Sequence, residues 1–144
     1  MKNVGLNKDL LRACTTGDID QVRRLLDQDA DANWAYKYGY TALMEAALFG
    51  HKGTCELLIE KGADVDLADI YGFTALIRAA CEGHKEICEL LVANGADVNK
   101  ANKDGWSALM FAARNRHEDL CELLVQSGAD TTNTQNDDTP PENE

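Results

Sequence analysis

The chain has 144 residues, 44% of them hydrophobic, which is enough for one domain with a core of its own. Its formal net charge of −11 at pH 7 argues against nucleic acid and anionic membrane surfaces as partners and favours a protein with a basic or mixed surface. No apolar run approaches the roughly 18 residues of a membrane span, and five cysteines without a secretory signal indicate a reducing compartment, cytoplasmic or nuclear.

The first predicted elements are two short helices within residues 6–33, after a lead-in of residues 1–5. The stretch "LLRACTTGDIDQVRRLLDQDADAN" (10–33) keeps the spacing of later repeats, with Gly17 two repeat lengths before Gly83. Polar side chains replace apolar ones of the third copy in this stretch (Gln21 and Arg24 for Ile87 and Leu90). The end of a stack of repeats needs a polar outer face, so this pattern predicts an N-terminal cap.

The stretch "WAYKYGY" (34–40) places aromatic side chains at every second position, as a β-strand would. Its counterparts in the next two copies, "LADIYGF" (67–73) and "KANKDGW" (100–106), do not alternate in this way. A core strand would recur with the rest of the repeat. We therefore predict a projecting β-hairpin arm here rather than a strand of a buried sheet.

Each hairpin is followed by two predicted helices, and the pattern recurs at a constant spacing along the chain. The first helices lie in "GYTALMEAALFGH" (39–51), "GFTALIRAACEGH" (72–84) and "GWSALMFAARNRH" (105–117), where a hydroxyl residue can cap the helix (Thr41, Thr74 and Ser107). The second helices run through "CELL" to a glycine expected in the left-handed conformation (Gly62, Gly95 and Gly128). Arg116 stands where the two preceding copies have a glycine, and a left-handed residue there costs about 1–2 kcal/mol. We expect this turn to be rearranged.

Each period contains a turn and two antiparallel helices and reads G-x-T-A-L-x-x-A-A-x-x-G-H-x-x-x-C-E-L-L-x-x-x-G-A-D. This pattern resembles the ankyrin repeat. The resemblance implies an all-α solenoid of helix-turn-helix units with projecting β-hairpin loops, in four repeats (about 6–33, 34–66, 67–99 and 100–132). The family's usual Thr-Pro-Leu-His tetrapeptide lacks its Pro and His here, as in Thr41-Ala42-Leu43-Met44. Residues 133–144 are interpreted as an acidic polar tail or as the start of a truncated fifth repeat.

The resemblance also implies a partner on the concave face, which the hairpin tips and the exposed side of the first helices form. On the repeat register the aromatic residues fall in the hairpins and first helices, and none falls at a core position. Large rigid rings on a polar surface are typical interface anchors. We predict a partner-binding groove with rings at its centre (Tyr38, Tyr40, Phe49, Tyr71, Phe73, Trp106 and Phe111) and charged residues that select the partner (Arg78, Glu82 and Arg114). The alternative is that these rings, like Trp34 and Tyr36 at the hairpin base, pack along the hairpins and hold the repeats together.

His and Cys recur as i,i+4 pairs on the second helices (His51/Cys55, His84/Cys88 and His117/Cys121). A zinc site needs about four ligands around one ion, whereas equivalent positions of stacked repeats lie roughly 10 Å apart. Each His is expected to brace its own helix turn and each Cys to fill the core. A cysteine nucleophile would also need a base and an orienting group in a pocket. We therefore predict no metal, no cofactor and no catalytic residue.

The sequence thus indicates a monomeric, non-enzymatic module that binds a protein partner. Two alternatives stay open: a stoichiometric inhibitor of an enzyme or of a capping protein, and a structural segment of a longer ankyrin scaffold. The stretch "LVANGADVN" (91–99) also resembles the motif that ankyrin repeats present to an asparaginyl hydroxylase, with Asn99 as the modified residue.

Overall fold

The computed structural model describes residues 3–132, which form four successive pairs of α-helices. The pairs are α1 (Val4–Thr16) with α2 (Ile19–Asp27), α3 (Ala42–Leu48) with α4 (Lys52–Glu60), α5 (Ala75–Glu82) with α6 (Lys85–Ala93), and α7 (Ala108–Arg114) with α8 (Glu118–Gln126). Helix α1 begins slightly before the expected first repeat. The interpretations of residues 133–144 lie outside the described residues.

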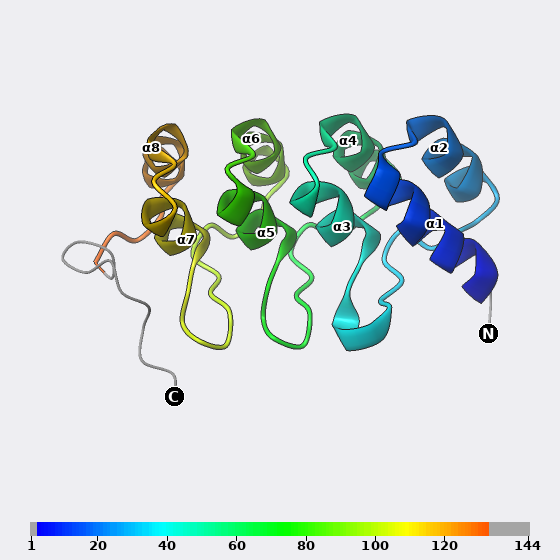
Figure 1. Cartoon of the computed structure of the whole chain (residues 1–144), viewed down its shortest axis with the longest axis horizontal. Helices are drawn as coiled ribbons and strands as arrows, with labels where there is room; N and C mark the ends of the chain where they lie inside the picture. The colour runs from blue at the N-terminus through cyan, green and yellow to red at the C-terminus, as the bar shows by residue number, and fades with distance from the viewer. Residues whose placement is uncertain (1–2, 133–144) are drawn as a thin grey trace.

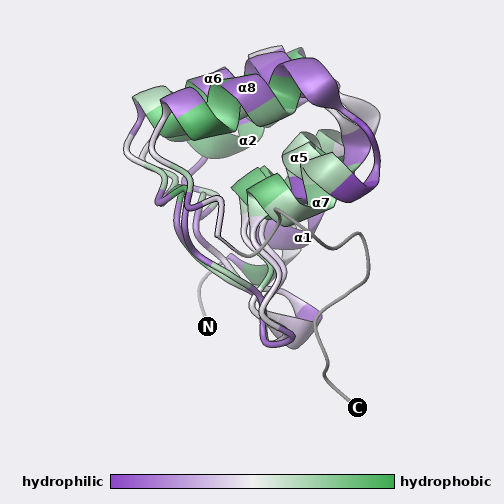
Figure 2. Cartoon of the chain, turned by 90° about the vertical axis from the view of Figure 1, so that its left-hand side faces the viewer, coloured by the Kyte–Doolittle hydropathy of each residue, from purple (hydrophilic) through white to green (hydrophobic). Residues whose placement is uncertain are grey.

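The pairs stand side by side in one row, with the first helix of each pair in one layer and the second helix in the other (Figure 1). A loop projects beyond the first layer ahead of α3, α5 and α7, and the view along the row shows these loops superimposed on one another (Figure 2). This arrangement is the expected all-α solenoid. Within residues 3–132, no helix is long and apolar enough to cross a membrane.

The core lies between the two layers and between neighbouring pairs. Small side chains line the core-facing side of the first helices, where Ala46, Ala79 and Ala112 are completely buried. Leucines of the second helices close the other side (Leu58, Leu91 and Leu124). Each helix is too short to be stable alone in water, so the apolar contact between repeats has to stabilise the stack.

The first helices begin at the predicted hydroxyl caps. The side-chain oxygen of Thr41 accepts a hydrogen bond from the Met44 amide at 3.3 Å, and Thr74 accepts one from the Ile77 amide at 3.2 Å. Ser107 repeats this bond in α7. The cap also orients the helix, because it fixes the residue at which the hairpin backbone turns into the first layer.

The turn after α7 keeps the geometry of the earlier repeats, so the expected rearrangement at Arg116 is wrong. Arg116 adopts the left-handed conformation itself, with φ 64°. The His117 amide still bonds to the Ala112 carbonyl at 2.9 Å, as the His84 amide bonds to the Ala79 carbonyl at 2.9 Å. The retained bond offsets the cost of placing a side chain in this region.

The corresponding glycines of the earlier repeats have a second role. An added Cβ at Gly50 would lie 2.8 Å from the His84 ring, and one at Gly83 would lie 2.7 Å from the His117 ring. The histidine of the next repeat therefore occupies the space of the missing side chain. No described residue imposes that restriction on Arg116.

We expect Arg116→Gly to raise the free energy of unfolding by about 1 kcal/mol, because glycine adopts a positive φ without steric cost. Urea unfolding followed by circular dichroism measures the change. Gly83→Ala is the matched reverse substitution and should destabilise the chain, since it adds both a strained φ and a clash with His117. An Arg116→Gly variant less stable than the wild type would contradict this account.

Candidate partner-binding face

The loops before the first helices are hairpins closed by very little β-structure. In the described residues, β-pairing is limited to the single bridges Ala68–Thr74 and Ala101–Ser107. The loop that contains "WAYKYGY" forms a 3-10 turn at Lys37–Gly39 instead, with Tyr38 in the left-handed region at φ 63°. The Tyr36 amide bonds to the Tyr40 carbonyl at 2.7 Å across its neck. The alternating aromatics thus belong to a projecting arm and not to a core strand, as predicted, but a 3-10 turn takes the place of the expected β-pairing in this arm.

A polar side chain holds each of the last two hairpin tips in shape. Asp69 accepts hydrogen bonds from the amides of Tyr71 at 2.9 Å and Phe73 at 3.0 Å. Asn102 is its equivalent in the next repeat and accepts from the amides of Asp104 and Trp106. Both side chains are buried. The tips are therefore built from internal bonds and do not rely on a partner for their shape.

Backbone hydrogen bonds join the tips into one edge. The Ile70 amide donates to the Tyr38 carbonyl at 2.8 Å, and the Lys103 amide donates to the Tyr71 carbonyl at 2.9 Å. The tips approach so closely that a Cβ added to Gly72 would lie 2.9 Å from the Asn102 Cα. The three hairpins thus form a continuous ledge in front of the first helices.

Six of the ten predicted site residues stack on one another behind this ledge (Tyr40, Arg78, Phe73, Phe111, Trp106 and Arg114, in spatial order). We call this set the aromatic ladder. The Arg78 guanidinium lies 5.4 Å from the Tyr40 ring centroid and 4.3 Å from that of Phe73. The ring centroids of Phe73 and Phe111 are 5.9 Å apart, and those of Phe111 and Trp106 are 4.7 Å apart. Arg114 ends the ladder, 5.4 Å from the Trp106 ring.

The ladder corrects the expectation that no aromatic residue occupies a core position. Trp106 is 5% exposed, and Phe73 and Phe111 pack against the core cluster. The contact between Phe73 and Phe111 crosses from the third repeat to the fourth, and Trp106 packs against Phe111 within the fourth. These contacts match the alternative interpretation, in which the rings hold the repeats together.

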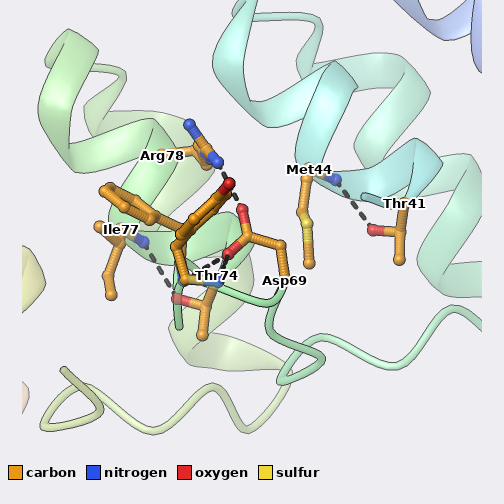
Figure 3. A network of polar contacts seen from close by, with 8 residues as sticks. Thr41, Met44, Asp69, Thr74, Ile77 and Arg78 are labelled. Atoms are coloured by element: carbon orange, nitrogen blue, oxygen red, sulfur yellow. Dashed lines mark hydrogen bonds and ion pairs between the residues drawn. The ribbon is translucent and has the colours of Figure 1, made fainter. Parts of the chain in front are cut away.

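Arg78 is also an ion-pair partner of Asp69 (Figure 3). Its Nη2 lies 2.6 Å from Asp69 Oδ2, and the side chains are 24% and 2% exposed, respectively. The Nε atom of Arg78 is buried without a hydrogen-bond partner among the described residues. The Arg78 side chain therefore contacts both the rings of the ladder and the hairpin that precedes its own helix.

Tyr40 links the ladder to the first repeat through Glu45. Burial, followed by a hydrogen bond to the Glu45 carboxylate, raises the pKa of the Tyr40 hydroxyl well above its usual value. The same carboxylate accepts a hydrogen bond from the Thr15 hydroxyl at 2.5 Å. Polar and aromatic contacts thus run from α1 to α7 across the first helices.

The most exposed aromatic residues lie on the ledge itself. Tyr38 is 63% exposed and Tyr71 is 54% exposed, and their ring centroids are 6.2 Å apart. Ile70 is 49% exposed next to Tyr71 and was missed by the sequence reasoning, which considered aromatic and charged residues only. The sequence feature that could have revealed this exposed residue is an isoleucine in the turn "DIYG", where the next copy has a lysine.

Two predicted site residues lie away from the ledge. Phe49 caps the C-terminal end of α3 and is 50% exposed, and Glu82 is the last residue of α5. The hairpins lead into the opposite, N-terminal ends of these helices. The structure thus separates Phe49 and Glu82 from the Tyr38–Tyr71 pair.

The three histidines bridge neighbouring repeats, so the expectation that each braces its own helix turn is wrong. The Nε2 atom of His51 lies 3.0 Å from the Thr15 carbonyl, and that of His84 lies 3.1 Å from the Leu48 carbonyl. His117 makes a longer contact of the same kind, 3.4 Å from the Cys81 carbonyl. A carbonyl only accepts hydrogen bonds, so Nε2 carries the proton in each case.

The titratable residues that the structure describes show neither a metal centre nor an activated thiol. No group of three or more His, Cys, Asp or Glu able to hold a metal ion occurs within residues 3–132. Burial raises the pKa of Cys14, Cys55 and Cys88 to about 12 and that of Cys81 to about 11. These thiols are protonated at neutral pH, the opposite of what a nucleophilic cysteine needs.

Asn99 ties two successive loops together. Its side-chain nitrogen Nδ2 donates to the Gly128 carbonyl at 3.2 Å, and its side-chain oxygen Oδ1 accepts from the Asp130 backbone amide at 2.7 Å. Asn33 makes the same pair of bonds to Gly62 and Asp64. The side chain therefore has a structural role, and its hydroxylation stays a prediction.

Comparison with known proteins agrees with the repeat architecture. The family model for ankyrin repeats (3 copies) matches residues 10–102 and 68–135. The comparison with curated proteins gives no match. The two matched ranges overlap and together cover most of the chain, including every helix from α2 to α8. The chain therefore belongs to the ankyrin repeat family.

Proposed function

We propose that this protein is a non-enzymatic module that binds another protein through the ledge and the adjoining side of the first helices. The observation that carries the proposal is the Tyr38–Tyr71 pair, two large rings that are more than half exposed and lie 6.2 Å apart. Ile70 extends the same apolar surface. Exposed rings of this size are typical anchors of protein interfaces.

The aromatic ladder supports this role from behind. Its members are packed or paired within the chain, so they fix the position of the ledge rather than supply most of its contact area. A partner that meets a rigid ledge loses less conformational freedom on binding than one that must first order a loop. The last two tips meet this condition, because the buried side chains of Asp69 and Asn102 accept hydrogen bonds from their backbone amides.

The test is affinity capture from a lysate of the cells that express the chain, with a matched control. Tyr38→Ala/Tyr71→Ala removes the exposed pair. Phe49→Ala/Val125→Ala removes two side chains of comparable exposure, 50% and 45%, that lie away from the ledge. Circular dichroism establishes that each variant is folded. We expect a protein that the wild type and the control capture and that the tyrosine variant does not.

Equal capture by all three proteins would contradict the proposal. Loss of capture in the control alone would move the site to the helix ends, where Phe49 lies. Titration of the captured protein with the wild type then separates an inhibitor from a passive adaptor, because only an inhibitor lowers the activity of its target.

A further inference from the structure

The charge of the chain is divided unequally between its two layers. The second helices and the loops that follow them carry sixteen acidic and five basic residues (residues 18–33, 51–66, 84–99 and 117–132). The hairpins and first helices carry eight basic and five acidic residues (residues 3–17, 34–50, 67–83 and 100–116). The layer that forms the ledge is thus net positive in a chain whose formal charge is −11.

Internal contacts occupy most of the acids in the positive layer. Asp69 is paired with Arg78, and Asp9 is paired with Arg12 at 2.6 Å. Glu45 accepts the Thr15 hydroxyl and a hydrogen bond from Tyr40. Asp104 at a tip and Glu82 at a helix end are the exposed acids that remain in this layer.

The cations near the exposed rings are in contrast directed to the surface. Lys37 and Lys103 are exposed on the tips next to Tyr38 and Tyr71, whereas Arg114 is exposed at the C-terminal end of α7, beside the Trp106 ring. Lys37 Nζ lies 5.7 Å from the Tyr36 ring, so it stays beside the aromatic surface. A partner on the ledge therefore meets rings flanked by two lysines.

We propose that the partner presents an acidic polypeptide segment with apolar side chains between its carboxylates. This inference rests on the proposed function. It gives the partner a negative charge, whereas the composition of the whole chain favours a positively charged partner. The reason is distance: charges in contact with the partner interact strongly, whereas exposed charges more than about 8 Å apart are largely screened at physiological ionic strength. The acids of the second layer lie roughly one helix spacing, about 10 Å, behind the first.

A polypeptide fits these observations better than a nucleic acid does. Nucleic acid binding depends on neutralising many phosphates, and only a few exposed cations lie along the ledge. Two lysines beside two tyrosines, with Arg114 farther along the same layer, instead suit a short segment in which a few carboxylates flank an apolar side chain.

Two synthetic copolymers test the sign of the charge, poly(Glu,Tyr) and poly(Lys,Tyr). We expect the wild-type chain to bind poly(Glu,Tyr) at about 0.15 M salt, where screening limits the repulsion from distant acids. Lys37→Gln/Lys103→Gln/Arg114→Gln should weaken this binding about tenfold, since each exposed ion pair contributes modestly. Lys52→Gln/Lys61→Gln/Lys85→Gln makes the same charge change in the second layer and should leave the affinity unchanged.

Failure of this inference is distinguishable from failure of the proposed function. Binding of poly(Lys,Tyr) alone, abolished by Tyr38→Ala/Tyr71→Ala, would overturn the acidic partner but retain the ledge as the site. Binding of either copolymer that neither the tyrosine variant nor the first cation variant reduces would overturn both. Binding of single-stranded oligodeoxythymidylate in place of poly(Glu,Tyr), or a dimer lost in the tyrosine variant, would assign the ledge to a nucleic acid or to a second copy.

Discussion

Trp106→Ala is expected to lower the free energy of unfolding by about 3–5 kcal/mol, the range found when a buried aromatic residue is truncated. The ring is 5% exposed and lies 4.7 Å from Phe111, which in turn contacts Phe73 of the preceding repeat. The substitution therefore leaves a cavity at the contact between the third and fourth repeats. Urea unfolding followed by circular dichroism measures the loss.

Tyr71→Ala is the control, because Tyr71 is an aromatic residue of the neighbouring hairpin that is 54% exposed. Its substitution should change the stability by no more than about 0.5 kcal/mol, as for most surface positions. A repeat stack can also lose its terminal repeat separately, so an additional early transition in Trp106→Ala would still fit the expected contact. Equal stability of the two variants would contradict a structural role for the Trp106 ring.

The repeat architecture was predictable because it depends on local chemistry that recurs in the sequence. Thr41, Thr74 and Ser107 each cap a helix through a bond to an amide in its first turn. The left-handed glycines that follow the second helices, such as Gly62 with φ 100°, depend equally on their immediate neighbours. A constant repeat length then stacks these local units without further information.

Contacts between repeats were not predictable in the same way. Tyr40, Phe73 and Trp106 occupy one position of the repeat, yet only Trp106 is fully buried. The difference depends on the side chains that each ring meets, and Trp106 meets Phe111 of its own first helix, where the equivalent residue of α5 is Arg78. The histidines show the same limit, since their carbonyl partners belong to the preceding repeat.

The net charge of the whole chain does not reveal that the two layers carry opposite net charges. A net charge of −11 suggested a basic partner, but that excess comes from the second helices, their loops and residues 133–144. The assignment of helices to layers is what divides the charges. Composition is therefore a guide to solubility and long-range repulsion, whereas the charges beside Tyr38 and Tyr71 decide what the ledge can contact.

Asp69→Asn is expected to cost about 2–3 kcal/mol, because it removes the anion of a largely buried pair and leaves Arg78 in place. Breaking a buried ion pair typically costs about 3–5 kcal/mol, and the 24% exposure of Arg78 reduces that figure. The turn itself should survive, since Asn102 makes the same two amide contacts in the next repeat. The new side-chain NH2 group, however, would face the Arg78 guanidinium, which carries only hydrogen-bond donors and cannot accept a bond from it. Urea unfolding measures the cost.

A double-mutant cycle with Arg78→Met separates the ion pair from the packing. Methionine retains an apolar side chain between Tyr40 and Phe73 but needs no anion. Because a buried pair can often be replaced by apolar groups at little cost, Asp69→Asn/Arg78→Met should be more stable than Asp69→Asn alone. Additive losses in the double variant would mean that the two residues stabilise the hairpin independently. Arg78 would then be available to a partner's carboxylate, and the acidic segment proposed for the ledge would extend onto the ladder.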